Sequence, residues 1–118
     1  MPKYSDKFGQ LFHALADPTR RAVIERLGRG SASVSELVEP FDMALSSFMQ
    51  HLGVLEQSGL VSSQKTGRTR TYSLEPQAVQ HVESWLSTQR HTWEQRLDQL
   101  DNYLMHMTKQ PALKRREP

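Results

Sequence analysis

The strongest constraint on the fold is a stripe of apolar residues in the last third of the chain. After Glu75-Pro76, apolar residues recur at steps of three and four positions, with a single step of seven. The members of this stripe are Val82, Leu86, Trp93, Leu97, Leu100, Leu104 and Met107. The spacing predicts a coiled-coil-like helix over residues 77–107, about 46 Å long if continuous, with a break near Trp85 as the alternative.

An unpaired apolar stripe of this length is unusual on the surface of a monomer. We therefore expect two copies of the chain to pair through it as a homodimer, with help from an apolar face of the first helix. The predicted dimerisation residues are Phe8, Phe12, Leu86, Trp93, Leu97, Leu100 and Leu104.

The composition sets further limits. A chain of 118 residues is long enough for one domain with one core. It contains no cysteine, which excludes disulfides and thiolate metal sites. No apolar run has the length of a membrane span, and the first residues lack the apolar core of a signal peptide, so we expect a soluble cytoplasmic protein. We predict a single domain over residues 1–108 and a basic, disordered tail over residues 109–118.

Helix-starting signals occur at two places before residue 40. Asp17-Pro18 is typical of an N-cap followed by proline at the first helical position. Ser33 and Glu36 have the spacing of a capping box, and Pro40 ends the short helix that follows. A second helix is predicted over about residues 44–58, with Gly59 at its C-terminus. Its apolar positions are Leu45, Phe48, Leu52 and Leu55.

The periodicity then changes from helical to extended. Val61–Lys65 and Arg70–Leu74 predict two short strands, joined by a turn at residues 66–69. The order of elements is therefore helix, helix, helix-turn-helix, hairpin and long helix. This order predicts a mainly α protein with a small β-hairpin, namely a winged helix-turn-helix with a long C-terminal dimerisation helix.

In a helix-turn-helix, the second helix enters the major groove of DNA and its N-terminal side chains reach base edges. The exposed polar side chains predicted there are Ser46, Ser47, Gln50 and His51. Glutamine can bond adenine at N6 and N7, and serine suits base edges or phosphates. This helix carries no lysine or arginine, so affinity must come from charges elsewhere.

The hairpin is where we expect those charges. Arg68, beside Gly67, is predicted at the tip, where it can enter a minor groove or bind phosphate. Lys65 and Arg70 flank it, and Arg20 is a further phosphate candidate at the start of an early helix. The net charge of +2 is by itself weak support for a nucleic-acid partner.

Each of these assignments has an alternative. The polar residues and the hairpin cations can be ordinary solvated surface, and His51 can instead cap or pack within the helix pair. A winged helix can also serve only as a protein-interaction module, which the lack of cations on the second helix would suit. We do not expect an enzyme, because the chain has no phosphate-binding glycine loop and no recognisable pairing of nucleophile and base.

Three segments together resemble the ArsR-type bacterial repressors: residues 14–27 (ALADPTRRAVIERL), 47–61 (SFMQHLGVLEQSGLV) and 67–72 (GRTRTY). The resemblance implies a winged-helix homodimer that binds an inverted-repeat operator in double-stranded DNA and represses transcription. Base contacts would fall on residues 44–51 and wing contacts on residues 65–70. Where many members have Ser and Gln early in the helix, this chain has Ala44 and Leu45.

Many members of this family sense metals, and the resemblance allows their sites to be sought in this chain. The helix before the reading helix has no cysteine, and the family's metal-binding aspartate position on the last helix is occupied by Val79. The spacing from His81 to His91 is one residue short, a rotation of about 100° on a helix. We therefore expect no metal and no cofactor, and leave an unknown small-molecule effector open. Trp85 and Trp93 are interpreted as dimer core, with an aromatic-lined ligand pocket as the alternative.

Overall fold

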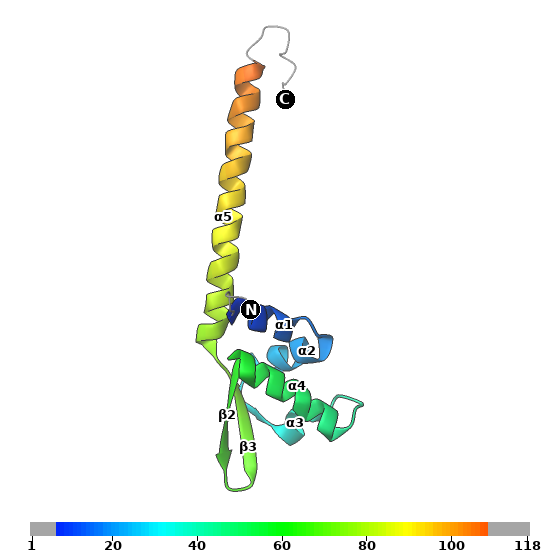
Figure 1. Ribbon diagram of the computed structural model, residues 1–118. Coiled ribbons are helices and arrows are strands. Elements are labelled where there is room, and N and C mark those ends of the chain that lie inside the picture. The colour runs from blue at the N-terminus through cyan, green and yellow to red at the C-terminus, as the bar shows by residue number, and fades with distance from the viewer. Residues whose placement is uncertain (1–6, 109–118) are drawn as a thin grey trace, which may run out of the picture. The chain divides into compact units, whose positions relative to one another are not determined.

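The structure, a computed structural model, describes residues 7–108, most of them in α-helices (Figure 1). The predicted tail at residues 109–118 lies outside the described residues. The chain divides into two compact units, Met1–Val82 and Glu83–Pro118, and each is described by itself. The helices are α1 (Lys7–Leu15), α2 (Pro18–Leu27), α3 (Val34–Val38), α4 (Leu45–Ser58) and α5 (Pro76–Met107). The strands are β1 (Ala32–Ser33), β2 (Val61–Thr66) and β3 (Thr69–Leu74).

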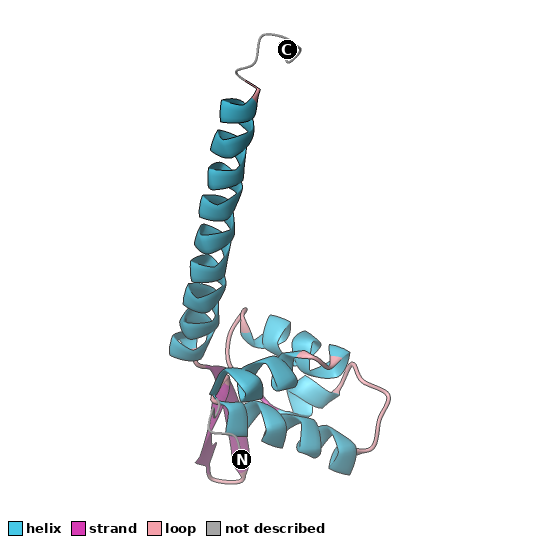
Figure 2. Ribbon diagram, turned by 45° about the horizontal axis from the view of Figure 1, so that its top comes forward, coloured by secondary structure: helices cyan, strands magenta, loops and turns pink. Residues whose placement is uncertain are grey.

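The core of the first unit lies between α1–α4 and the base of the sheet. Helices α1–α4 gather on one side of the β2–β3 hairpin (Figure 2). The buried apolar side chains are Leu11, Ala14, Val23, Leu27, Ala32, Leu37, Phe48, Leu52, Leu55, Leu60, Val61 and Tyr72. Of the four apolar positions named for α4, Phe48, Leu52 and Leu55 are buried. Leu45 is 56% exposed because it occupies the first turn of α4, beyond the end of the core.

The predicted helix boundaries are confirmed by their caps. The Asp17 carboxylate accepts hydrogen bonds from the backbone N–H groups of Thr19 (2.8 Å) and Arg20 (3.2 Å). Ser33 and Glu36 form a reciprocal capping box, in which the Ser33 N–H donates to Glu36 Oε1 at 2.8 Å. These bonds from Ser33 lower the pKa of Glu36. Gly59 ends α4 with a φ of 88°, a left-handed conformation that favours glycine.

The three strands form an antiparallel sheet in the order β1-β3-β2. Strand β1 was not predicted, because two residues are too short for an alternating pattern; it pairs Ala32 with Tyr72 on β3. The predicted turn at residues 66–69 is confirmed, with Gly67 (φ 65°) and Arg68 as its two central residues. Each strand is one residue longer at the turn than predicted, because Thr66 and Thr69 pair with each other.

Helix α5 is continuous from Pro76 to Met107, so the alternative of a break near Trp85 is wrong. Its first residues belong to the first unit, where Ala78 and Val82 pack against the core. Within residues 7–108, no helix is both long and apolar enough to cross a lipid bilayer.

Candidate nucleic-acid interface

The exposed face of α4 carries a line of small and polar residues. Ser46, Ser47 and Gln50 are all exposed, as predicted for base-reading side chains. At 3.6 residues per turn, Ser46, Gln50 and Gly53 project within an arc of about 60°. A Cβ added at Gly53 would meet no atom within 4 Å. Nothing within the described chain therefore requires a glycine at this point of the helix.

The N-terminus of α4 has a feature that the sequence analysis missed. Its N-cap residue is Ala44, which makes no side-chain hydrogen bond to the first turn. The first N–H groups of the helix therefore have no side-chain cap, and they carry the positive end of the helix dipole. The absence of Ser, Thr, Asp or Asn at position 44 was the available signal. This positive end lies beside Ser46 and Ser47, on a helix without cationic side chains.

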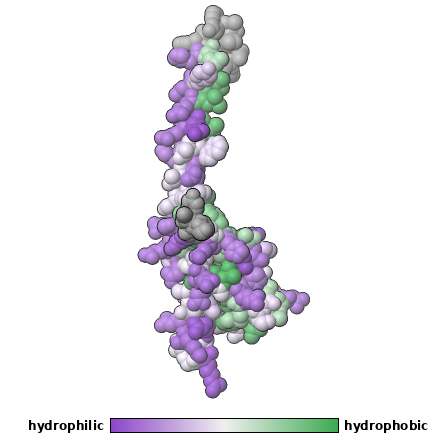
Figure 3. All heavy atoms as spheres, viewed as in Figure 1, coloured by the Kyte–Doolittle hydropathy of each residue, from purple (hydrophilic) through white to green (hydrophobic). Residues whose placement is uncertain are grey.

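The β2–β3 hairpin, which we call the wing, carries three exposed cations. Lys65 and Arg70 are directly opposite each other across the two strands, and Arg68 occupies the turn. Side chains alternate along a strand, so Lys65 lies on the same face as Ser63. Ser63 donates a hydrogen bond to Glu56 of α4 at 2.8 Å, which identifies this face as the one toward α4. The exposed end of the wing is hydrophilic (Figure 3).

A short relay of hydrogen bonds joins the wing to α4. Arg70 Nη1 donates to Ser63 Oγ at 2.7 Å, and Ser63 Oγ donates to Glu56 Oε2 at 2.8 Å. Beside this relay, burial and then the negative charge of Glu56 raise the pKa of Tyr72. Sequence reasoning missed the relay because its members are distant in sequence and individually ordinary. The relay links the two elements that carry the predicted readers and cations.

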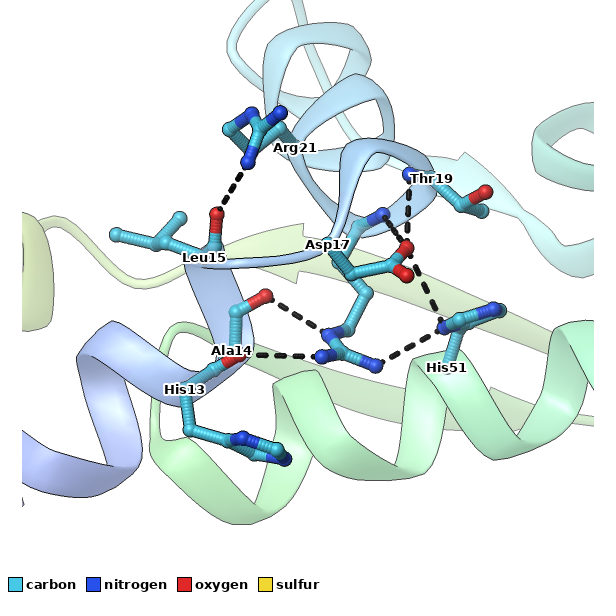
Figure 4. Close-up of polar contacts among 8 residues, drawn as sticks. His13, Ala14, Leu15, Asp17, Thr19, Arg21 and His51 are labelled. Carbon is cyan, nitrogen blue, oxygen red and sulfur yellow. Dashed lines mark hydrogen bonds and ion pairs between the residues drawn. The ribbon is translucent and has the colours of Figure 1, made fainter.

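The structure places Arg20 beside His51, whose polar contacts are drawn in Figure 4. Arg20 is only 9% exposed, and Nη1 of its guanidinium lies 3.1 Å from Nδ1 of His51. The other two guanidinium nitrogens donate to backbone carbonyls. This burial corrects the prediction of Arg20 as a phosphate ligand, because its guanidinium is bonded to groups inside the first unit. His51 is half-buried and packs against Arg20, and its contact with DNA stays a prediction.

Asp17 completes this cluster. Its Oδ2 lies 3.7 Å from Nδ1 of His51. Partial burial raises the pKa of the Asp17 carboxyl, but the hydrogen bonds from the N–H groups of Arg20 and Thr19 outweigh burial and lower the pKa overall. Asp17 is thus the helix cap that the sequence predicted, and it also lies beside α4.

In the second unit, α5 presents the predicted apolar stripe. Leu86, Trp93, Leu97, Leu100 and Leu104 fall within an arc of about 60° of the helix, and all five are exposed, Trp93 the most at 65%. Apolar side chains follow one edge of this part of the chain in Figure 3.

The two predicted dimerisation residues on α1 have different surroundings. Phe8 packs against the core of the first unit, with its ring centroid 4.8 Å from that of His81. This contact is made within one chain, so we do not carry Phe8 into the proposed dimer surface. Phe12 is 37% exposed and remains in it.

Within residues 7–108, no three His, Asp or Glu side chains lie close enough together to hold a metal ion. The expectation of a metal-free protein stays a prediction.

The helix pair α3–α4, followed by a basic hairpin, defines a winged helix-turn-helix protein. Residues 15–64 match a family model described as a helix-turn-helix domain. The transcriptional repressor SdpR of Bacillus subtilis is 30% identical over 76 residues, which cover 64% of this chain and 84% of SdpR. The regulator Rv2034 of Mycobacterium tuberculosis is 42% identical over 65 residues, covering 55% of this chain and 61% of that protein.

Solved structures agree with this class. The crystal structure of the ArsR family transcriptional regulator RHA00566 is similar with a TM-score of 0.73 and 52% sequence identity, over 80% of this chain and 97% of that one. The chain belongs to the ArsR family of helix-turn-helix transcriptional regulators.

Proposed function

We propose that the chain binds double-stranded DNA as a homodimer and represses transcription at an inverted-repeat operator. Helix α4 lies in the major groove, where Ser46, Ser47 and Gln50 contact base edges, and the wing contacts the backbone. The observation that carries this proposal is the position of Lys65 and Arg70 on the side of the hairpin that faces α4. One DNA duplex can then meet both the polar face of α4 and the charges.

The charge arrangement supports a polyanionic partner. Lys65 opposite Arg70 is a like-charge pair across two strands, an arrangement that destabilises a hairpin. Phosphates near the pair and near Arg68 relieve this repulsion and release counterions from the DNA. The positive end of α4 adds attraction where the helix has no cation of its own.

The proposed dimer uses the stripe on α5 together with Phe12. Five large side chains that project within one narrow arc form an apolar patch of the kind that pairs helices. A twofold dimer presents two copies of α4, and the operator half-sites are then centred about 34 Å apart, one helical turn of DNA.

The proposal is tested by fluorescence anisotropy with a duplex from the chain's own promoter and a scrambled duplex of equal length. We expect tighter binding to the promoter and affinity that falls steeply with salt. The alternative is a protein-interaction module, which the absence of lysine and arginine on α4 favours. No salt-sensitive retention on heparin and no promoter binding would replace our proposal with that alternative.

A further inference from the structure

Arg20 closes the C-terminus of α1 from inside the first unit. Its Nε donates to the Ala14 carbonyl at 2.8 Å, and its Nη2 donates to the His13 carbonyl at 3.1 Å. Carbonyls in the last turn of a helix have no partner within that helix, and Arg20 supplies one to Ala14. The His13 carbonyl accepts from Arg20 as well as from the backbone N–H of Ala16 at 3.1 Å. Two bonds to the backbone also fix the plane of the guanidinium. Its remaining nitrogen, Nη1, is thereby aimed at His51 (Figure 4).

The contact between Arg20 and His51 determines where the imidazole carries its proton. A guanidinium has N–H donors and no acceptor. At 3.1 Å from Nη1, Nδ1 of His51 must therefore accept, and it cannot carry a proton of its own. The Asp17 carboxylate has the opposite effect to Arg20, because its negative charge favours a proton on Nδ1 of His51. Asp17 Oδ2 is 3.7 Å from Nδ1, beyond hydrogen-bond range, and already accepts two backbone N–H groups.

The second ring nitrogen of His51 has a different environment. In Figure 4 it points away from both Arg20 and Asp17. The His51 side chain is 23% exposed, and its only hydrogen bond with another residue in the range 7–108 is the one at Nδ1. The proton excluded from Nδ1 therefore sits on Nε2, on a partly exposed side chain that lies one helical turn from Ser47 on α4.

We infer that Arg20 is a positioning residue that holds His51 as the neutral Nε2–H tautomer, so that Nε2–H donates a hydrogen bond to DNA. This inference rests on the proposed function and assigns one donor within it. Because the imidazole is held by a guanidinium that is itself held by α1, the donor is pre-oriented and loses little freedom on binding. Arg20 acts through His51 and makes no contact with DNA.

The tautomer is tested first, without DNA. Nitrogen-15 NMR of the imidazole distinguishes a protonated ring nitrogen from an unprotonated one. At neutral pH we expect Nδ1 of His51 to be unprotonated and Nε2 protonated. In an Arg20→Met variant, whose side chain offers no donor, the signals should move toward a mixture of tautomers. A proton on Nδ1 in the wild-type protein would overturn the inference.

The donor is tested with two amide substitutions. His51→Asn places an oxygen near the position of Nδ1, so it keeps an acceptor for Arg20 but has no donor where Nε2 was. His51→Gln reaches the Nε2 position with an amide N–H but gives up that acceptor. We expect His51→Asn to melt near the wild-type temperature and to bind promoter DNA about tenfold more weakly, the loss of one hydrogen bond to a charged group. His51→Gln should recover part of that affinity.

A double-mutant cycle separates positioning from general stability. Arg20→Lys should weaken DNA binding in the wild-type background and have much less effect in the His51→Asn background, because the donor that it positions is absent. Equal losses in both backgrounds, or wild-type affinity in His51→Asn, would overturn the inference alone. A wild-type protein that shows the Nε2–H tautomer but binds no promoter DNA would overturn the proposed function and with it the donor role.

Discussion

Lys65 and Arg70 lie directly opposite each other on β2 and β3, so two positive charges face each other near the turn of the wing. Arg70 also donates to Ser63, which donates to Glu56 of α4. The two cations lie close together, and their repulsion lowers the stability of the wing. Hydrogen bonds through Ser63 connect the wing to α4, the helix proposed to read bases.

Replacing Arg68 by alanine removes the cation at the tip of the wing. We expect weaker binding to promoter and scrambled duplexes alike. A plot of log affinity against log salt should become shallower by about one unit for each phosphate that the wing no longer binds. Arg96→Ala removes the same charge from α5 and serves as the control. An unchanged slope in Arg68→Ala would mean that the wing tip does not touch phosphate.

Gln50→Ala tests base reading by α4. We expect the preference at one base position of the operator to relax, with a loss of about 1–3 kcal/mol on the preferred site. Gln57 is also exposed on α4 but lies near its C-terminal end, so Gln57→Ala should leave base preferences unchanged. Identical preferences for Gln50→Ala and the wild-type protein in a selection from random duplexes would remove Gln50 from the readers.

Gly53→Ala separates stability from binding. Alanine is favoured over glycine inside a helix by about 1 kcal/mol, and the added Cβ meets no neighbour within 4 Å, so the melting temperature should rise. DNA binding should weaken, because Gly53 lies in line with Ser46 and Gln50 on the face expected to approach DNA closely. Thr88→Ala, exposed on α5, should raise stability without affecting binding. Unaltered affinity in Gly53→Ala would show that α4 does not approach DNA at this point.

Leu97→Asp tests the dimer surface. An aspartate in the middle of the α5 stripe would be buried without a partner charge in a dimer, so we expect light scattering to give the mass of a monomer. Gln95 lies on the opposite side of the helix, and Gln95→Asp should leave the mass unchanged. A dimeric Leu97→Asp protein would place the interface elsewhere.

The cap at Asp17 predicts a specific pH dependence. Its pKa is lowered in the folded protein from its usual 3.8. The stability contributed by its charge is therefore fully present well above pH 3.8 and is lost as the pH falls through the lower folded value. Asp17→Asn keeps a capping oxygen without the charge. The difference in melting temperature between wild-type and Asp17→Asn proteins should shrink toward zero on acidification, whereas a constant difference would mean that the charge is not responsible.

Local signals in the sequence were sufficient for the helix boundaries. Asp17, Ser33, Glu36 and Gly59 act within three residues of their partners, so their roles are visible in the order of the residues alone. The stripe on α5 was predictable for the same reason, because a regular helix converts spacing directly into direction. The tip position of Arg68 followed from the adjacent glycine.

Interactions between distant residues were decided by the tertiary structure. Arg20 resembles a free surface cation in sequence, and only the packing of α1 against α2 and α4 brings the His13 and Ala14 carbonyls and His51 to its guanidinium. The two-residue strand β1 exists because β3 offers it an edge, and Glu56 meets the wing only through Ser63.

The apolar stripe along α5 was therefore determined by the sequence itself. A repeat of threes and fours without an internal glycine or proline specifies one apolar side of one helix. The contacts of Arg20 with α4, the proposed base-reading helix, could not be predicted from residue spacing. A buried arginine is recognised only by the groups that surround it. Those groups come from separate elements that only the folded chain brings together.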